Sequence, residues 1–462
     1  MKFRSHRLLQ VFQIAACFIS IMMLMACAGQ PKLSFSYEND KALQSVLAKP
    51  VAYPAASFAV FSDMHIFDPA LGTAGKAFEE YIAADRKLVR ESSEILDAAL
   101  TGMKNESVSF VLAPGDLTKD GEQASHIMAA NYLKQLKDAG KKVYVVPGNH
   151  DVRNGHSYRY VGDGKERVPS VTAREFADIY ADYGYKDALF RDSASLSYVS
   201  EPVAGLWLLA MDDCRYDENI EDKESITDGK FKPATLKWIE EMLSKAAREN
   251  KAVIGMVHHG IMEHYIGQEK NYGEYIVDSA PDVSRMLAAY NVRMVFTGHY
   301  HSQDITVASY PDTGKFVFDL ETGSLVTYPC PYRVVSIDAS QKAAVTVKMV
   351  TSIKSHPQDF PQYARKYLED GIAGIATKTI MGYKVDKPEA EMLSKQVAQA
   401  FVAHYSGDEI IKPGQQLIQE GGLSPMGWFV IQYRKDLIVG LWNDRPPQDN
   451  NVTLDLANGT WK

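Results

Sequence analysis

Short apolar runs that stop at polar or glycine-containing turns alternate with amphipathic stretches over residues 57–350. Such runs predict buried strands, and apolar positions repeating every three to four residues predict helices. Strands and helices in alternation are typical of a layered α/β fold. We expect strands at 57–61, 108–113, 142–146, 196–199, 206–211, 252–257, 292–296, 316–320, 333–337 and 344–350, and helices at 85–104, 122–139, 172–183, 233–249 and 282–290.

The strand pattern stops near residue 355. Residues 387–405 carry apolar side chains at helical spacing, with Pro388 near the start and Gly407 after the end, which predicts a helix. We therefore expect an α/β domain over residues 57–352, followed by a small, mainly helical domain over residues 355–462.

Polar side chains that can bind metal ions follow five of the expected strands. In residues 143–151, an apolar run ends at Pro147-Gly148 and is followed by three side chains that can bind a metal or transfer a proton, Asn149, His150 and Asp151. Ligands bind at the carboxyl ends of strands in α/β sheets, so five such ends predict one site. In an extended segment, residues i and i+2 point the same way, so two of the motifs can each hold one ion. The candidates are Asp63 and His65, Asp116, Asn149 and His150, His258, and His299 and His301.

The order of these motifs carries a resemblance to a known family. Asp63-x-His65, Gly115-Asp116, Gly148-Asn149-His150-Asp151, His258 and Gly298-His299-x-His301 resemble the motif set of the calcineurin-like metallophosphoesterase superfamily. The resemblance implies a four-layer αββα fold with two packed mixed sheets flanked by helices, whereas periodicity alone predicts only α/β. It also implies two metal sites that share one bridging ligand. The first would be bound by Asp63, His65 and His301, the second by Asn149, His258 and His299, and both by Asp116.

The chemistry of the donors agrees with a dinuclear site. Imidazole, carboxylate and amide oxygen suit Mn, Fe, Zn, Co or Ni, and the absence of thiolate removes any strong preference for zinc. We expect two divalent or mixed-valence ions, with Mn and Fe favoured. Two ions held close together can clamp the attacking and leaving oxygens of a phosphoryl group.

His150 and Asp151 are the expected catalytic residues, because His150 lies beside a ligand without being one in the family pattern. It would protonate the leaving oxygen or stabilise the phosphoryl charge, and Asp151 is expected to fix its orientation. Of His258 and His259, alternation along a strand aims only one at the metals, and the family pattern favours the first.

Several other side chains are interpreted as structural. His264 and Tyr272 are expected in a surface loop, although either would be able to reach a substrate. The loop arginines are expected to be solvated, with phosphate binding as the alternative. The second domain's aromatic residues are interpreted as core or interface residues. The loop arginines are Arg153 and Arg159, and the aromatic residues are Trp428, Phe429, Tyr433 and Trp442. His404 is interpreted as a buried or rim histidine with its hydrogen bonds satisfied.

Residues 1–26 are typical of a bacterial lipoprotein signal peptide. Three basic residues precede an apolar run over residues 8–25, which ends in Leu24-Met25-Ala26-Cys27 and resembles a lipobox. Cys27 would then carry a lipid anchor, with residues 27–56 as a tether leading into the first strand. The alternative is an uncleaved anchor helix. Both alternatives predict an exported protein held at a membrane.

The net charge limits the classes of molecule that the protein is expected to bind, and the cysteines offer no thiolate metal site. The net charge is −8, and the loss of residues 1–26 makes it more negative, which argues against a nucleic-acid polymer. A small phosphorylated substrate remains compatible, because metal ions supply the local positive charge. Cys214 and Cys330 would remain after processing and are interpreted as small buried residues, with nothing in the sequence to show that they pair.

The substrate is the least determined property. In overall plan the chain resembles bacterial lipoproteins of the superfamily with a C-terminal helical domain, grouped near the class III cyclic-nucleotide phosphodiesterases. This implies a phosphodiesterase acting on a nucleotide, cyclic or linear. A phosphomonoesterase and a sphingomyelinase-like phospholipid phosphodiesterase are alternatives within the family. A surface-binding lipoprotein without turnover, or one whose helical domain binds a partner, is the alternative from another class.

Overall fold

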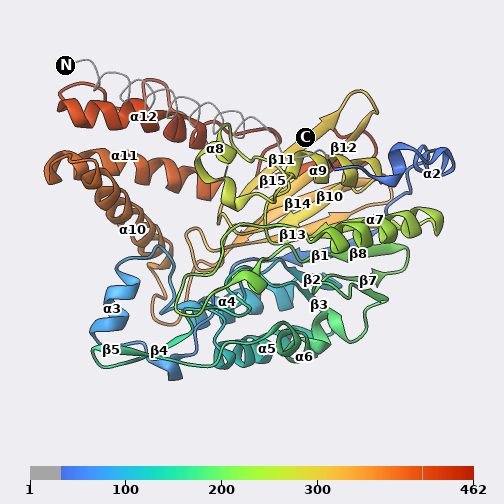
Figure 1. The fold of residues 1–462 in the computed structure, drawn as a ribbon, viewed down its shortest axis with the longest axis horizontal. Helices are drawn as coiled ribbons and strands as arrows, with labels where there is room; N and C mark the ends of the chain where they lie inside the picture. Colours follow the sequence, from blue (N-terminus) through green and yellow to red (C-terminus); the bar gives the residue numbers. More distant parts are fainter. Residues whose placement is uncertain (1–32, 408) are drawn as a thin grey trace, which may run out of the picture.

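Two β-sheets packed face to face form the centre of the molecule, which the computed structural model describes for residues 33–407 and 409–462 (Figure 1). The first sheet has six strands in the order β15-β14-β13-β1-β2-β3, and the second has seven in the order β11-β12-β10-β9-β8-β7-β6. Within them β1, β2 and β3 run parallel, as do β8, β9, β10 and β12, and the other neighbours pair antiparallel.

The first sheet consists of β1 (Ala56–Val60), β2 (Phe110–Ala113), β3 (Lys142–Val145), β13 (Pro331–Ile337), β14 (Lys342–Met349) and β15 (Asn451–Asp455). The second consists of β6 (Phe190–Arg191), β7 (Tyr198–Val203), β8 (Leu206–Ala210), β9 (Ala252–Met256), β10 (Met294–Thr297), β11 (Asp304–Tyr310) and β12 (Lys315–Glu321). An exposed hairpin lies outside both sheets and comprises β4 (Tyr158–Val161) and β5 (Gly164–Arg167).

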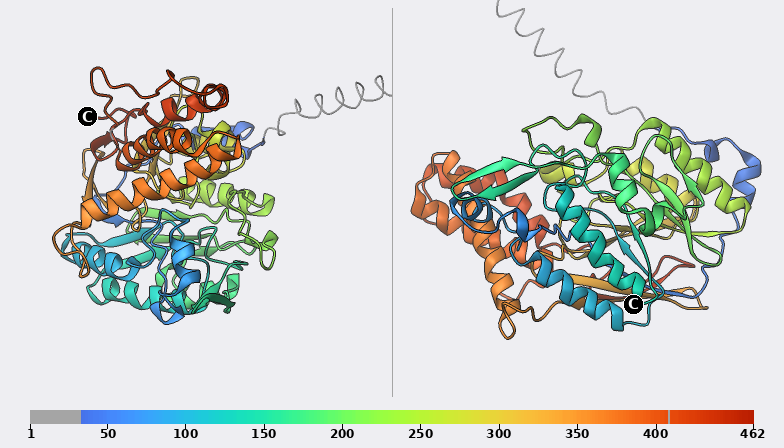
Figure 2. Two further views of the ribbon diagram at one scale, coloured as in Figure 1. Left: turned by 90° about the vertical axis from the view of Figure 1, so that its left-hand side faces the viewer. Right: turned by 90° about the horizontal axis from the view of Figure 1, so that it is seen from below.

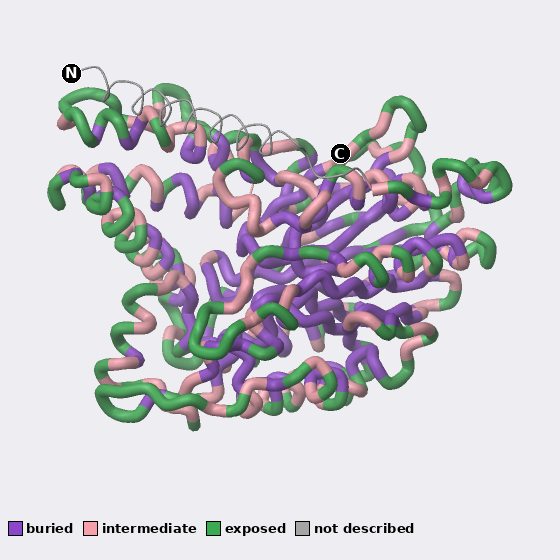
Figure 3. Tube along the Cα trace, viewed as in Figure 1, coloured by how far each residue is buried: buried purple, intermediate pink, exposed green. Residues whose placement is uncertain are grey.

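Aromatic side chains fill the space between the sheets. Phe58 of β1 stacks on Phe110 of β2 with ring centres 4.6 Å apart, and it meets Phe296 of β10 edge-on at 5.3 Å. All three are fully buried, so the alternating apolar positions of the strands form a core between two layers, as packed sheets require (Figure 3).

Helices cover the outer faces of both sheets. Leu96 of α4 and Leu133 of α5 join the core of the first sheet, and Ile239 of α7 and Leu287 of α9 pack against the second. The four-layer αββα fold expected from the resemblance is confirmed. The helices are α2 (Lys41–Leu47), α3 (Lys76–Ile82), α4 (Ser92–Asn105), α5 (Gln123–Asp138), α6 (Ala173–Ile179), α7 (Pro233–Arg248), α8 (Gln268–Tyr272), α9 (Ala280–Ala289), α10 (Phe360–Gly382), α11 (Lys387–Ser406) and α12 (Pro425–Leu441), with short helices at Ser36–Glu38, Pro69–Leu71, Ala181–Tyr185, Tyr216–Glu218 and Gly273–Tyr275.

The C-terminal helices α10, α11 and α12 lie together at one end of the molecule (Figures 1 and 2). The start of α11 follows from its sequence, since Asp386 accepts a hydrogen bond from the Glu389 N–H and Pro388 occupies the first turn. The chain does not stay helical to its end. Strand β15 pairs antiparallel with β14, so part of the region assigned to the helical domain is an edge strand of the first sheet.

The structure also corrects the expected start of one helix and the expected tether. The helix expected at 85–104 begins at Ser92, because the Asp85 carboxylate accepts hydrogen bonds from the next two backbone N–H groups and holds an irregular loop. Phe35, Leu43 and Leu47 are buried in the core of the second sheet, so the expected tether is in part packed against the fold.

Three of the aromatic side chains that were interpreted as core or interface residues are exposed on α12. Trp428, Phe429 and Tyr433 are 54%, 48% and 57% exposed, whereas Trp442, which follows α12, is half-buried against the core of the C-terminal helices, in agreement with the interpretation. Cys214 and Cys330 are free and buried, as expected. The expected signal peptide and lipobox lie outside the described residues. Within residues 33–407 and 409–462, the helices are too short or too polar to cross a membrane.

Candidate metal centre

The carboxyl ends of β1, β2 and β3 in one sheet and of β9 and β10 in the other meet at one edge of the two packed sheets. The expected ligands come together there. Within each of three groups, the possible ligand atoms lie less than 4.8 Å from one another. Asp116 belongs to two of the groups, which places it between the two halves of the centre. The groups are Asp63, His65 and His301; His65, Asp116 and His150; and Asp116, His258 and His299.

In the first half, His65 and His301 point their Nε2 atoms at each other across 3.2 Å. Asp63 Oδ1 lies 3.5 Å from His301 Nε2 and 4.0 Å from His65 Nε2. Nitrogens bound to one ion at about 2.1 Å would stand roughly 3.0 to 3.4 Å apart, so the two imidazoles are spaced as ligands of one ion.

In the second half, His258 Nε2 lies 3.5 Å from Asp116 Oδ2 and 3.3 Å from Asn149 Oδ1. The other ring nitrogen of His258 donates to the Pro114 carbonyl at 2.8 Å, which fixes the ring with Nε2 toward the centre. His259 turns away, toward the Asp213 carboxylate and the Thr227 carbonyl. The structure therefore places His258, rather than His259, at the centre.

The backbone of the ligand residues is unusual. Asp63, His65, Asp116, His299 and His301 all have positive φ, between 34° and 75°. Such conformations are uncommon for residues other than glycine and cluster at functional sites. Both i, i+2 pairs do converge, but through left-handed turns and not through the extended backbone that the sequence analysis assumed.

Two motif glycines permit this crowding. A Cβ at Gly148 would lie 2.1 Å from Asp116 Oδ1, and a Cβ at Gly298 would lie 2.3 Å from Asp63 Oδ2. Only glycine lets these two loops approach the carboxylates so closely.

The buried nitrogens support ion binding. His299 Nε2 is buried and makes no hydrogen bond to the part of the chain that the structure describes. Burial lowers the pKa of His65 and His299 well below the usual value, so both rings are neutral, as metal binding requires. Burial would also lower the pKa of His258, but Asp116 and Asp63 outweigh it and raise the pKa to about 10. A cation bound beside Asp116 would displace that proton.

The model of the calcineurin-like phosphoesterase family matches residues 56–303, which is more than half of the chain and spans all the ligands. The chain belongs to this family. Enzymes of this family use two divalent metal ions, and ligand groups for two ions are present in this metallophosphoesterase. The comparison with curated proteins gave no match.

Solved structures match parts of the chain at low identity. A dimetal phosphatase from Danio rerio is 14% identical, with 65% of this chain and 97% of that chain covered and a TM-score of 0.44. A purple acid phosphatase from yellow lupin seeds is 11% identical, with 66% and 53% covered and a TM-score of 0.39. Phosphopantetheinyl hydrolase from Mycobacterium tuberculosis is 12% identical, with 58% and 89% covered and a TM-score of 0.30. With TM-scores this low, these likenesses say nothing of the substrate.

His150 stands at the rim of the centre of this metallophosphoesterase, with its side chain 25% exposed and its Nε2 4.0 Å from Asp116 Oδ2. Its Nδ1 donates to the Lys119 carbonyl at 2.8 Å and to Asp120 Oδ1 at 2.9 Å. Burial would lower the pKa of His150, but Asp116 and Asp120 raise it. The ring therefore holds a proton more firmly than a free histidine does.

The prediction that Asp151 orients His150 is wrong. Asp151 accepts hydrogen bonds from the backbone N–H groups of Gly148, Leu117 and Thr118, and so ties the loop after β3 to the loop after β2. Asp120 takes the orienting role instead. Sequence reasoning missed Asp120 because it lies in a Lys-Asp-Gly turn, where an aspartate is ordinary.

Two cations also escaped the sequence analysis. Lys87 is buried, and its positive charge lowers the pKa of His65, His150 and His301, although burial is the larger cause at each ring. Arg86, which donates to the Tyr405 hydroxyl at 3.1 Å, acts on His301 in the same way. Both come from the loop that replaces the expected helix start, so periodicity could not place them.

Other candidates take structural roles. His264 is fully buried, with Nδ1 2.7 Å from Asp304 and Nε2 3.2 Å from Asp319, so the expected surface position is wrong. His404 is buried, as expected, and its Nδ1 pairs with Glu409 at 2.5 Å. Its buried Nε2 makes no hydrogen bond within the described residues, so only one of its two nitrogens is satisfied there. The remaining loop residues form exposed ion pairs, Arg153 with Asp217 and Arg159 with Glu166.

Proposed function

We propose that this metallophosphoesterase hydrolyses a phosphodiester. The observation that carries the proposal is a pocket of about 300 Å³ whose wall includes Tyr275, and Tyr275 lies 4.5 Å from His299 between ring centres. A phosphodiester bears a second substituent besides its leaving group, and that substituent has space beside the metal centre. A phosphomonoester has only its leaving group, so with the leaving oxygen at His150 it would leave the space unused.

Different residues would bind the metal ions, attract the substrate and donate a proton. Two divalent ions, when bound by the ligands described above, supply Lewis-acid stabilisation of charge and activation of water. Arg86 and Lys87 attract the anionic substrate to the centre. His150, oriented by Asp120, holds a proton at Nε2 for the leaving oxygen.

Aryl esters test the class of substrate. The protein, freed of metal and supplied again with Mn²⁺, should hydrolyse methyl 4-nitrophenyl phosphate with kcat/KM at least about tenfold above that for 4-nitrophenyl phosphate, because the site accepts the second substituent that only the diester carries. Equal or better turnover of the monoester would support the phosphomonoesterase. Folded protein without turnover under any divalent ion would support the surface-binding lipoprotein.

The narrower predictions concern the group on the diester. The resemblance to cyclic-nucleotide phosphodiesterases predicts a nucleotide, and a phospholipid is the alternative. Comparing a cyclic nucleotide, a linear dinucleotide and a phospholipid in the same assay separates them.

We also propose that the enzyme is exported and held at a membrane by a lipid on Cys27, a proposal that rests on residues 1–27 of the sequence alone. Cys27→Ser should remove the mass of the acyl chains from the protein. Cys17→Ser, which alters the other cysteine of the same region, is the matched control and should leave that mass unchanged. A parent protein that carries no acyl mass and keeps residues 1–26 would favour the uncleaved anchor helix.

A further inference from the structure

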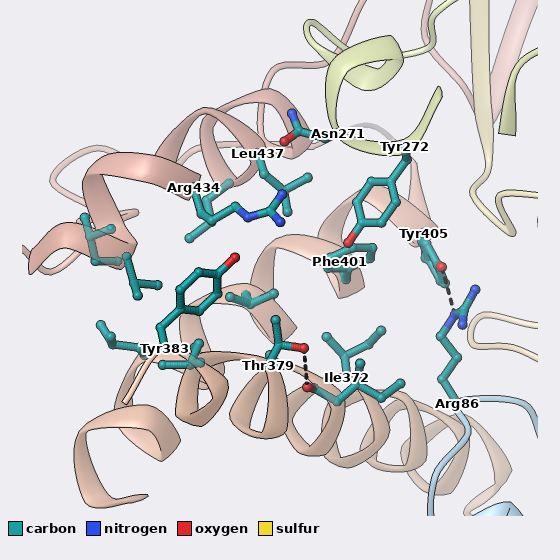
Figure 4. A pocket seen from close by; sticks show the side chains of 18 of the residues that line it. Arg86, Asn271, Tyr272, Ile372, Thr379, Tyr383, Phe401, Tyr405, Arg434 and Leu437 are labelled. Carbon is teal, nitrogen blue, oxygen red and sulfur yellow. Dashed lines mark hydrogen bonds between the residues drawn. The ribbon is translucent and has the colours of Figure 1, made fainter. Parts of the chain in front are cut away.

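The pocket beside the metal centre lies between the C-terminal helices and the loop that carries Tyr272 and Tyr275 (Figure 4). Its volume of about 300 Å³ is at the lower end of the range of small-molecule sites. Half of the residues of its wall are aliphatic, with contributions from all three helices. These side chains are Ile372, Ile375, Ala376 and Ile380 of α10, Leu393 and Val397 of α11, and Val430, Ile431, Leu437 and Ile438 of α12.

The two ends of the pocket differ in chemistry. Figure 4 shows Arg86 and Tyr405 at one end and Tyr383 at the other. The Arg86 end adjoins the metal centre, since the Tyr405 and His301 ring centres are 6.4 Å apart. A cation therefore stands where an anionic phosphate would sit, and an apolar channel leads away from it.

Two of the polar side chains of the wall bond the backbone of the preceding turn. The Thr379 hydroxyl donates to the Ile375 carbonyl at 3.0 Å, and the Asn271 amide donates to the Gly267 carbonyl at 2.8 Å. Arg434 of α12 also lines the pocket, and Figure 4 shows it among the pocket side chains. An alkyl chain against the aliphatic side chains has no polar group to satisfy, whereas a polar substituent would have to reach the few polar side chains of the wall to avoid the cost of an unpaired buried group.

We propose that this pocket binds an apolar chain of the phosphodiester substrate, so that the enzyme acts on amphiphilic phosphodiesters. The inference rests on the proposed phosphodiesterase function and names its substrate class. The chain lies among the aliphatic residues of the three helices, and the phosphate lies at the Arg86 end, against the metal centre. The C-terminal helices thus form a specificity subsite for the active centre.

Either a membrane or a dispersed amphiphile would supply such a substrate. The exposed Trp428 and Phe429 lie on the same helix as the pocket residues Val430 and Ile431. Aromatic side chains of this kind favour the interface of a bilayer. Both sources share one chemistry, a phosphodiester with an apolar chain, and the experiment below includes an arm for each.

A homologous series of 4-nitrophenyl alkyl phosphates, from methyl to octyl, tests the subsite. Each buried methylene is expected to raise kcat/KM up to about fourfold until the pocket is filled. In Ala376→Trp, which places an indole in the pocket, the ratio of octyl to methyl ester should fall toward one. Gln362→Trp, an exposed position on the same helix, should keep the ratio of the parent.

The outcomes separate the two proposals. A flat series in the parent, with clear turnover of the methyl ester, would overturn the apolar subsite and leave the phosphodiesterase standing. If no ester is turned over, the phosphodiesterase fails. Calorimetric titration with octyl phosphate against inorganic phosphate then tests the pocket by itself. Tighter binding of octyl phosphate that Ala376→Trp removes supports the subsite, and equal binding overturns it.

The vesicle arm uses phosphatidylcholine vesicles and dispersed short-chain phosphatidylcholine. Hydrolysis of the vesicles that is weakened in Trp428→Ala supports the subsite with a membrane as source. Hydrolysis of the dispersed lipid alone supports it with a soluble amphiphile as source.

Discussion

Asp116→Asn is expected to lower kcat/KM for an aryl phosphodiester by at least about 10³-fold. Its carboxylate lies 3.5 Å from both His65 Nε2 and His258 Nε2, and so joins the two halves of the centre. Asparagine keeps the shape of the side chain but loses the charge that two neighbouring cations need. The stabilisation that a metal ion gives to transition-state charge is worth several kcal/mol, which corresponds to a loss of this size.

The measurement combines steady-state kinetics with elemental analysis of bound metal. We expect Asp116→Asn to bind less metal per chain than the parent. Asp192→Asn serves as a matched control, because Asp192 is a buried carboxylate that bonds Thr235 and Ser195 away from the centre. Full activity in Asp116→Asn, or an equal loss in Asp192→Asn, would contradict the bridging role.

The sequence predicted the site through the ends of the strands. Apolar runs are local signals, and parallel strands bring their carboxyl ends to the same edge of a sheet. The family motifs supplied the pairing of ligands, and the structure brings those residues together at one edge. What local patterns did not show was how the ligands converge. The left-handed backbone of Asp63 and His299 depends on close contacts with loops that lie more than 200 residues away in the chain.

Residues that act through long-range contacts were missed for the same reason. Asp120 is an ordinary turn residue until the loop after β3 carries His150 to it. Arg86 becomes part of the centre only because Tyr405, more than 300 residues later, accepts its hydrogen bond. The apolar positions of residues 387–405 predicted α11 correctly, and the region around it was expected to be mainly helical. Periodicity did not show that α12 leaves Trp428 exposed and turns Ile431 toward a pocket.

His150→Ala is expected to lower kcat by about 10²- to 10⁴-fold for a diester with an alkyl alcohol as leaving group. An alkoxide departs poorly without a proton, and His150 Nε2 is positioned at the rim of the centre to provide one. A 4-nitrophenolate departs without a proton, so the same variant should lose much less activity on the aryl ester. Comparing kcat for the two leaving groups in parent and variant gives the measurement.

The dependence on the leaving group decides between the two roles that the sequence left open for His150. A loss confined to the alkyl ester identifies a proton donor, whereas equal losses on both esters would show that His150 stabilises the phosphoryl charge. Asp120→Asn should repeat the alkyl-specific pattern with a smaller loss of about 10- to 100-fold, as expected of a positioning residue that acts through the imidazole. His356→Ala, at a partly exposed histidine paired with Asp359 outside the centre, should leave both esters unaffected. Asp120 contacts Nδ1, and the leaving oxygen would meet Nε2. An alkyl-specific loss in both the His150 and the Asp120 variants would therefore show that Nε2 gives the proton to the leaving oxygen while Asp120 holds the ring at Nδ1.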